Sequence, residues 1–140
     1  MKKSTLSAGF VTMFIAAVAF NGSPAFAQEV KVVLNSSQQN PAVTSSATGS
    51  GTVTVNADMS VTVNITTSGI AATAAHIHMA PAGQNGPVIV PFVKNGDSFT
   101  AVPGAKLTEA QFAAFKAGNL YENVHSAANP GGEIRAQLRP

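Results

Sequence analysis

Apolar and polar residues alternate along most of this chain, which is the pattern of strands that bury one face. The alternation is clearest over residues 52–56 and 60–66, where every second residue is Val or Ile. The residues between them, Asn-Ala-Asp-Met, favour a turn, so the two segments predict a β-hairpin. Further apolar segments that are typical of strands cover residues 30–34, 70–79, 88–93, 98–102, 120–125 and 133–138.

One helix is predicted among these strands. Thr108 is a favourable N-cap residue, and Gln111 three positions later completes a capping box. Phe112 and Phe115 follow at a spacing that places both on one side of the helix, where they are expected to contact the core. Gly118 is placed to end the helix.

Residues 35–50 differ from the rest of the chain, since they are rich in Ser, Gln, Asn and Thr and show almost no apolar periodicity. This composition predicts a surface loop. About eight short strands, one short helix and no internal repeat predict an all-β protein. We expect an antiparallel Greek-key or immunoglobulin-like β-sandwich, or a barrel.

The N-terminus has the features of a signal peptide. Lys2 and Lys3 precede an apolar segment over about residues 10–20, and Ala25-Phe26-Ala27 is a small-x-small cleavage signal. The apolar segment is shorter than the ~20 residues that span a bilayer, so no membrane span is expected. The prediction is a signal peptide at residues 1–27, one domain at residues 28–140, and a periplasmic or extracellular location.

Charge and composition narrow the classes of partner. The net charge of +2 comes from the two lysines of the leader, because the remaining chain has six Lys or Arg and six Asp or Glu residues. A balanced charge gives no reason to expect nucleic acid or an anionic membrane as partner. The chain has no Cys, which excludes disulfides and thiolate metal ligands.

All three histidines lie in strand-like segments. His76 and His78 are two residues apart, so strand alternation places both on one face. His125 shares a face with Tyr121 and Asn123 on a later strand. If the two strands adjoin, the three imidazoles can converge on one ion, and imidazole ligands suit Cu²⁺ or Zn²⁺. Ring nitrogens more than ~7 Å apart would exclude such a site.

Glu133 is the candidate for a fourth ligand. It alternates with the apolar residues of its strand and therefore faces away from the core. Met79 and Glu122 are poorer candidates, because each directly neighbours a histidine and points to the opposite face. Glu133 and Arg135 share a face, and an alternative role for the pair is to orient His125.

Alternative interpretations remain for each of these residues. The histidines can be structural and hydrogen-bond to neighbouring turns, and Gly83, Gly86, Gly131 and Gly132 are expected to allow positive φ in those turns. A dinuclear site of the copper-zinc superoxide dismutase type needs more ligands than three histidines. No G-x-S-x-G motif or defined Ser–His–acid arrangement supports hydrolysis.

Two longer segments together resemble a known family. AHIHMAPAGQNGPVIVPF at residues 75–92 and LTEAQFAAFKAGNLYENVHSAANPGGEIRAQL at residues 107–138 resemble the CHRD domain, named after chordin. The resemblance extends from about residue 30 to residue 138. It implies a secreted, β-rich domain of the immunoglobulin-like or barrel kind, and it implies no catalytic residues.

The sequence therefore predicts an exported CHRD-domain binding module that is not an enzyme. In its most specific form the module binds a single transition-metal ion, Cu or Zn, through His76, His78 and His125, with Glu133 as the further ligand. The alternative is an extracytoplasmic protein-interaction or structural module, which has a protein partner, no metal and structural histidines.

Overall fold

The computed structural model describes residues 27–140. The predicted signal peptide, residues 1–27, lies outside the described residues apart from its last residue. Eight strands and two short helices follow one another along the chain: β1 (Gln28–Asn35), the 3₁₀-helix η1 (Ser36–Gln38), β2 (Thr48–Val55), β3 (Val61–Ser68), β4 (Ala72–Met79), β5 (Val88–Asn95), β6 (Ser98–Ala101), α1 (Glu109–Lys116), β7 (Leu120–Ser126) and β8 (Ile134–Leu138).

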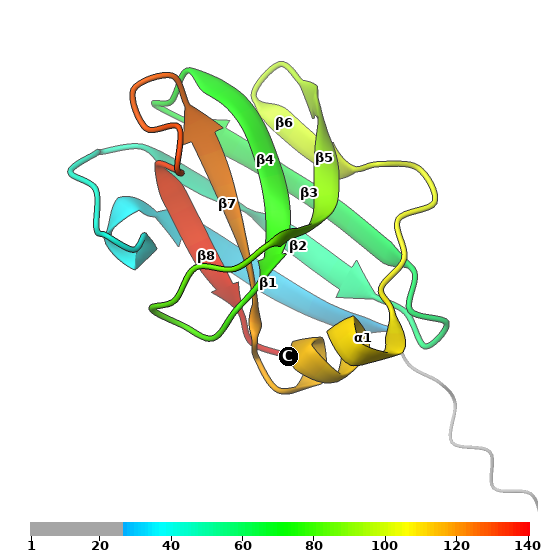
Figure 1. Ribbon diagram of the computed structural model, residues 1–140. Coiled ribbons are helices and arrows are strands. Elements are labelled where there is room, and N and C mark those ends of the chain that lie inside the picture. The colour runs from blue at the N-terminus through cyan, green and yellow to red at the C-terminus, as the bar shows by residue number, and fades with distance from the viewer. Residues whose placement is uncertain (1–26) are drawn as a thin grey trace, which may run out of the picture.

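The eight strands close into one antiparallel barrel in the order β1-β2-β3-β6-β5-β4-β7-β8 (Figure 1). The all-β prediction is confirmed, and of the two expected architectures the barrel is the one observed. Strands β4 and β7 are neighbours although β5, β6 and α1 separate them in the sequence. This pairing brings the segment with two histidines beside the segment with the third.

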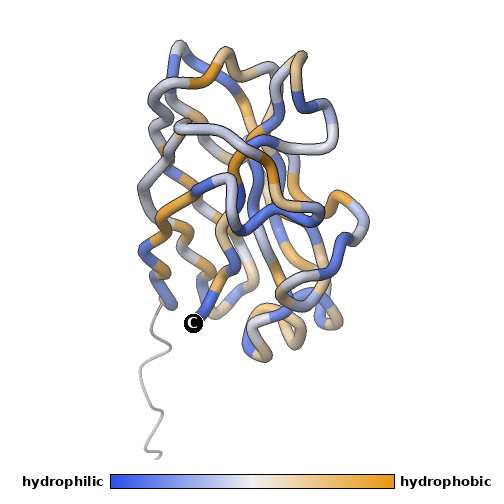
Figure 2. Tube along the Cα trace, turned by 90° about the vertical axis from the view of Figure 1, so that its left-hand side faces the viewer, coloured by the Kyte–Doolittle hydropathy of each residue, from blue (hydrophilic) through white to orange (hydrophobic). Residues whose placement is uncertain are grey.

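Hydrophobic and hydrophilic residues alternate along the strands (Figure 2). The buried members of this alternation fill the barrel with apolar side chains. Strand β3 shows the alternation most regularly, because every second residue from Val61 to Thr67 is buried. The predicted inward face of the β2–β3 hairpin is confirmed. Largest among the apolar core side chains are Leu34, Ile65, Ile77, Phe99, Phe115, Leu120, Ile134 and Leu138.

Helix α1 begins as predicted. The Thr108 hydroxyl accepts the backbone N–H of Gln111, and the Gln111 side chain accepts the backbone N–H of Thr108, so the capping box is confirmed. Gly118, just after the helix, has φ +75°, which favours glycine. Phe115 is completely buried in the core, whereas Phe112 is only half-buried and stacks beside it.

The predicted surface loop over residues 35–50 is partly wrong. Strand β2 begins at Thr48 and pairs with β1 along its full length. Glycines at positions 49 and 51 break the apolar alternation that would have identified this part of the strand. Gly51 is required by the close approach of β3, since a Cβ there would lie 1.9 Å from the Asn64 carbonyl oxygen.

None of the helices within residues 27–140 has the length and apolar character needed to cross a membrane.

Candidate metal centre

Two neighbouring strands carry the three histidines on the outside of the barrel. In the β4–β7 register His76 lies opposite Asn123, His78 lies opposite Tyr121, and His125 lies opposite Ala74. The residues that directly neighbour the histidines, Ile77 and Val124, point inward, since both are completely buried in the apolar core. The predicted common face is therefore confirmed for all three side chains.

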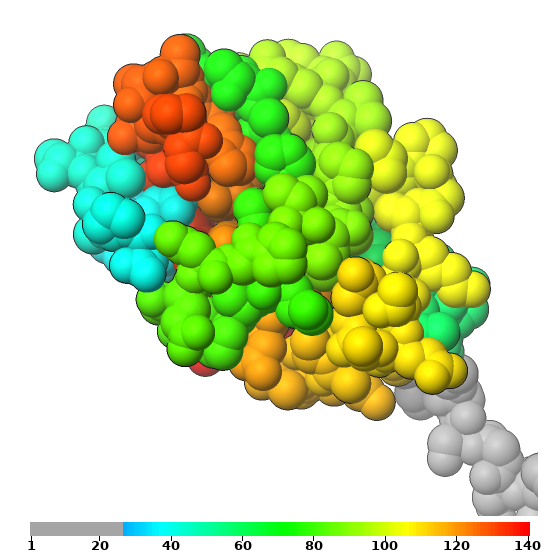
Figure 3. Space-filling model, in the orientation of Figure 1, coloured from blue at the N-terminus to red at the C-terminus, as the bar shows by residue number. Residues whose placement is uncertain are grey.

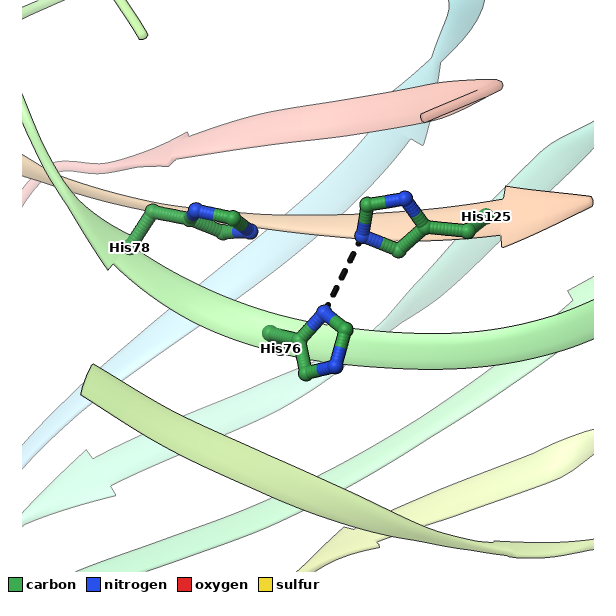
Figure 4. A group of neighbouring side chains, drawn as sticks. All are labelled: His76, His78 and His125. Carbon is green, nitrogen blue, oxygen red and sulfur yellow. Dashed lines mark hydrogen bonds between the residues drawn. The ribbon is translucent and has the colours of Figure 1, made fainter. Parts of the chain in front are cut away.

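The three imidazoles point toward a common position (Figure 4). One ring nitrogen from each of His76, His78 and His125 lies within 4.8 Å of the others. This separation is inside the ~7 Å limit for a shared ion. Around a tetrahedral ion with bonds of about 2.1 Å, ligand atoms are about 3.4 Å apart, so small side-chain rotations would bring the nitrogens to bonding distance.

Backbone carbonyl groups fix the orientation of two of the rings. The Nδ1 atom of His78 lies 2.9 Å from the Gly86 carbonyl oxygen, and the Nδ1 atom of His125 lies 2.9 Å from that of Pro130. A carbonyl oxygen only accepts hydrogen bonds, so both Nδ1 atoms carry the proton. Both Nε2 atoms therefore present a lone pair, which is the arrangement that metal-binding histidines need.

His76 and His78 differ in whether the ring nitrogen nearest the other imidazoles has a hydrogen-bond partner. Without a bound ion, His76 Nδ1 lies 3.0 Å from His125 Nε2 and, because that atom carries a lone pair, donates its proton to it. A bound ion would take the place of this proton, and His76 would then carry its proton on Nε2. The Nε2 atom of His78 is buried and has no hydrogen-bond partner among residues 27–140. Buried polar atoms are nearly always paired, so an unpaired lone pair directed at two other imidazoles needs an explanation.

The surroundings favour the neutral form of two of the rings, His76 and His78. Burial lowers the pKa of His76 and of His78, and the neighbouring imidazoles lower both further. A neutral imidazole is the form that binds a metal ion, because a protonated ring has no free lone pair. His76 and His78 are thus in the form that binds a cation at neutral pH.

A stack of three side chains forms one wall of the site. The ring of His78 lies parallel to that of Tyr121, with centroids 4.8 Å apart. The guanidinium of Arg135 covers the Tyr121 ring, 3.4 Å from its centroid. Arg135 also donates to the Asn85 side chain at 3.1 Å, which ties the stack to the β4–β5 loop. His78 therefore has little freedom to rotate away.

Gly86 in the β4–β5 loop contacts both of the stacked rings, His78 and Tyr121. Its carbonyl accepts the proton of His78 Nδ1, and its N–H donates to the Tyr121 hydroxyl at 3.2 Å. The expected positive φ is wrong here, as Gly83 has positive φ in this loop and Gly86 does not. Gly86 is needed because there is no space for a side chain: a Cβ would lie 1.9 Å from the Met79 carbonyl oxygen.

In the β7–β8 turn, the predicted positive φ is confirmed for Gly132 and is wrong for Gly131.

Three loops meet beside the strands that carry the histidines, and two of them contact a histidine through Gly86 and Pro130. The β4–β5 loop, the β7–β8 turn and the segment after η1 meet around a hollow on the face seen in Figure 3. A cavity of about 340 Å³ lies between them, lined by Gln39, Asn85 and Gly132 among others. Hydrogen bonds between Asn40 and the β4–β5 loop, at 2.7 and 2.8 Å, hold two of these loops together.

Glu133 is placed away from the imidazole group. Its two carboxylate oxygens accept hydrogen bonds from Ser45 at 2.6 Å and from Ser126 at 2.5 Å, which lower its pKa. The structure does not bring it among the ligand atoms that lie within 4.8 Å of one another. In this arrangement Glu133 connects the long β1–β2 loop to β7.

Two residues set aside as ligands do face away from the histidines. Met79 packs against the core, and the side chain of Glu122 is completely buried. Burial raises the pKa of Glu122 to about 8, so its carboxyl group is mostly protonated at neutral pH. Within the described chain, neither of its oxygens has a hydrogen-bond partner.

The strand alternation places Asn123 on the same face as His125, but it predicts no function for this residue. In the structure it is 2% exposed, and its Oδ1 atom has no hydrogen-bond partner within residues 27–140. The alternation with His125 was the only signal available in the sequence. That the oxygen lacks a partner depends on how the surrounding loops fold.

Taken together, the fold and the site define an antiparallel β-barrel domain with three convergent imidazoles on its outer wall. The family model for the CHRD domain matches residues 30–138, which is most of the chain. The chain therefore belongs to the CHRD family, as its sequence motifs indicated. Comparison with curated proteins gives no match, and neither does comparison with solved structures.

Proposed function

We propose that this protein is an exported, non-enzymatic binding module that holds one Cu or Zn ion at His76, His78 and His125. The observation that carries the proposal is the convergence of three ring nitrogens within 4.8 Å. Imidazole nitrogen suits Cu²⁺ and Zn²⁺, whereas Ca²⁺ and Mg²⁺ select oxygen ligands. Export rests on the predicted signal peptide.

The alternative function is a protein-interaction or structural module in which the histidines only support the loops. The hydrogen bonds of His78 to Gly86 and of His125 to Pro130 are what favour it. It leaves the buried Nε2 of His78 without a role, although a purely structural ring would be expected to use both nitrogens. A metal ion accounts for this nitrogen as well as for the two hydrogen bonds.

Calorimetric titration of the purified protein with Cu²⁺ and with Zn²⁺ tests the proposal. We expect saturable binding of one ion, and we expect the His76→Ala, His78→Ala double variant to bind at least about 100-fold more weakly, a larger loss than supporting residues cause. Saturating metal should also stabilise the wild-type protein, by about 2.7 kcal/mol at 100 times the dissociation constant.

The matched control is the Thr62→Ala, Asn64→Ala double variant. These residues have the same spacing on the outer face of β3, and both are exposed. The control should bind the ion as the wild-type protein does. Weak binding without a defined stoichiometry, equal in all three proteins, would refute the metal site and leave the interaction module as the better account.

A further inference from the structure

The buried carboxamide of Asn123 lies beneath the imidazole group. On β7 it is flanked by Tyr121 and His125 on the same face, and across the strands it lies between His76 on β4 and Arg135 on β8. An ion bound by the three imidazoles would therefore lie above this residue. Its 2% exposure means that solvent does not satisfy its polar atoms.

The orientation of the carboxamide is set by its nitrogen. Asn123 Nδ2 donates to the Gly131 carbonyl oxygen at 3.4 Å, which directs the amide nitrogen toward the β7–β8 turn. Gly132 confines it further, since a Cβ at that position would lie 2.5 Å from Asn123 Nδ2 and 2.5 Å from Gln39 Nε2. Oδ1 is thus the atom left to face the imidazoles.

Two buried acceptors meet at this point. Asn123 and His78 share the outer face of the β4–β7 pair, where Asn123 lies opposite His76 and His78 lies opposite Tyr121. The proton of His78 is held at Nδ1 by Gly86, so Nε2 offers Asn123 no donor. Neither Nε2 nor Oδ1 has a partner in the described part of the chain. Two adjacent lone pairs repel each other unless a positive charge lies between them.

We propose that Asn123 supplies the fourth protein ligand of the metal centre through Oδ1, in place of the expected Glu133. This inference rests on the proposed metal-binding function. A cation bound by the three imidazoles and this oxygen satisfies both unpaired acceptors, and four ligands complete a tetrahedral site. A carboxamide oxygen is a hard ligand, so the centre favours Zn²⁺ or Cu²⁺ over Cu⁺, which prefers soft sulfur ligands.

Two variants separate a ligand from a structural residue. Asn123→Leu removes the oxygen with little change of volume, and Asn123→Asp keeps an oxygen ligand and adds a charge. We expect the Leu variant to bind Zn²⁺ roughly tenfold or more weakly and the Asp variant to bind it at least as tightly as the wild-type protein. The metal-free Leu variant should unfold at nearly the wild-type temperature, because the change removes one long hydrogen bond together with an unsatisfied buried acceptor.

Zinc titration by calorimetry and thermal unfolding without metal provide the two readouts. Asn64→Leu on the exposed face of β3 is the matched control and should leave zinc affinity unchanged. If Asn123→Leu binds zinc as tightly as the wild-type protein, Asn123 is not a ligand, whatever happens to stability, and the three-histidine site stands. If the wild-type protein itself binds no zinc or copper, the metal function and this inference both fail.

Discussion

Between about pH 5 and pH 8.5, the free energy of unfolding of the wild-type protein is expected to fall by about 4 kcal/mol relative to that of a Glu122→Gln variant. Burial raises the pKa of the folded-state carboxyl group from 4.5 to about 8. Between these values the folded state keeps a proton that the unfolded state has lost. The stability that Glu122 contributes is thus fully present below pH 4.5 and is lost as the pH rises through 8.

Glutamine has no proton to lose, so the variant lacks this dependence. Chemical unfolding of both proteins across the pH range measures the difference between their free energies of unfolding, which cancels the titration of the histidines. Because His76 and His78 have lowered pKa values, their own contribution runs in the opposite direction, rising with pH up to about 6.5. Glu109→Gln, a change of an exposed carboxylate on α1, is the matched control. A free-energy difference that stays constant with pH would contradict the buried, protonated state of Glu122.

A Gly86→Ala variant is expected to lose both stability and metal affinity. A Cβ at this position would overlap the carbonyl group of Met79, so the β4–β5 loop must move. The movement withdraws the acceptor of His78 Nδ1 and the donor to Tyr121. We expect a loss of about 3 kcal/mol of stability from the overlap. Zinc affinity should fall roughly 10- to 100-fold, as it does when a residue that orients a ligand is removed.

Gly83→Ala serves as the control in the same loop. Nothing lies within 4 Å of a Cβ at Gly83, although its φ of +77° makes alanine strained. That strain is about 1–2 kcal/mol, and the ring of His78 keeps its acceptor, so zinc affinity should stay near the wild-type value. Denaturation curves and zinc calorimetry on the two variants provide the comparison. Equal affinities for Gly86→Ala and the wild-type protein would show that the loop carbonyl does not orient His78.

Local patterns were sufficient to predict most elements of the fold. The β2–β3 hairpin follows from the alternation of valines, and α1 follows from a cap that needs only Thr108 and Gln111. The choice between sandwich and barrel did not follow, because both bury one face of each strand. The choice depends on whether the first and last strands pair with each other. The β1–β8 pairing closes the barrel, and it joins residues that are 100 positions apart in the sequence. The early start of β2 was missed because glycines carry no hydropathy signal.

The candidate site shows the same limit. Alternation correctly predicted the face of each histidine, but whether the faces meet depends on the position of β7 beside β4. Glu133 was expected to be a ligand because strand alternation predicts the face on which a side chain lies, but not its distance from the histidines. In the structure, hydrogen bonds from two serines of other segments orient its carboxylate. Asn123 shares a face with His125 in the sequence, and only the folded loops reveal that its oxygen lacks a partner in the described structure.

The most direct test of the metal centre is anomalous diffraction from a crystal of the protein loaded with Zn²⁺, recorded at the zinc absorption edge. We expect one strong peak between His76, His78 and His125, with nitrogen ligands at about 2.0–2.1 Å. A peak only at surface carboxylates, or no ordered peak at a saturating zinc concentration, would contradict the proposed metal centre. The three histidines would then be supports for the loops around them.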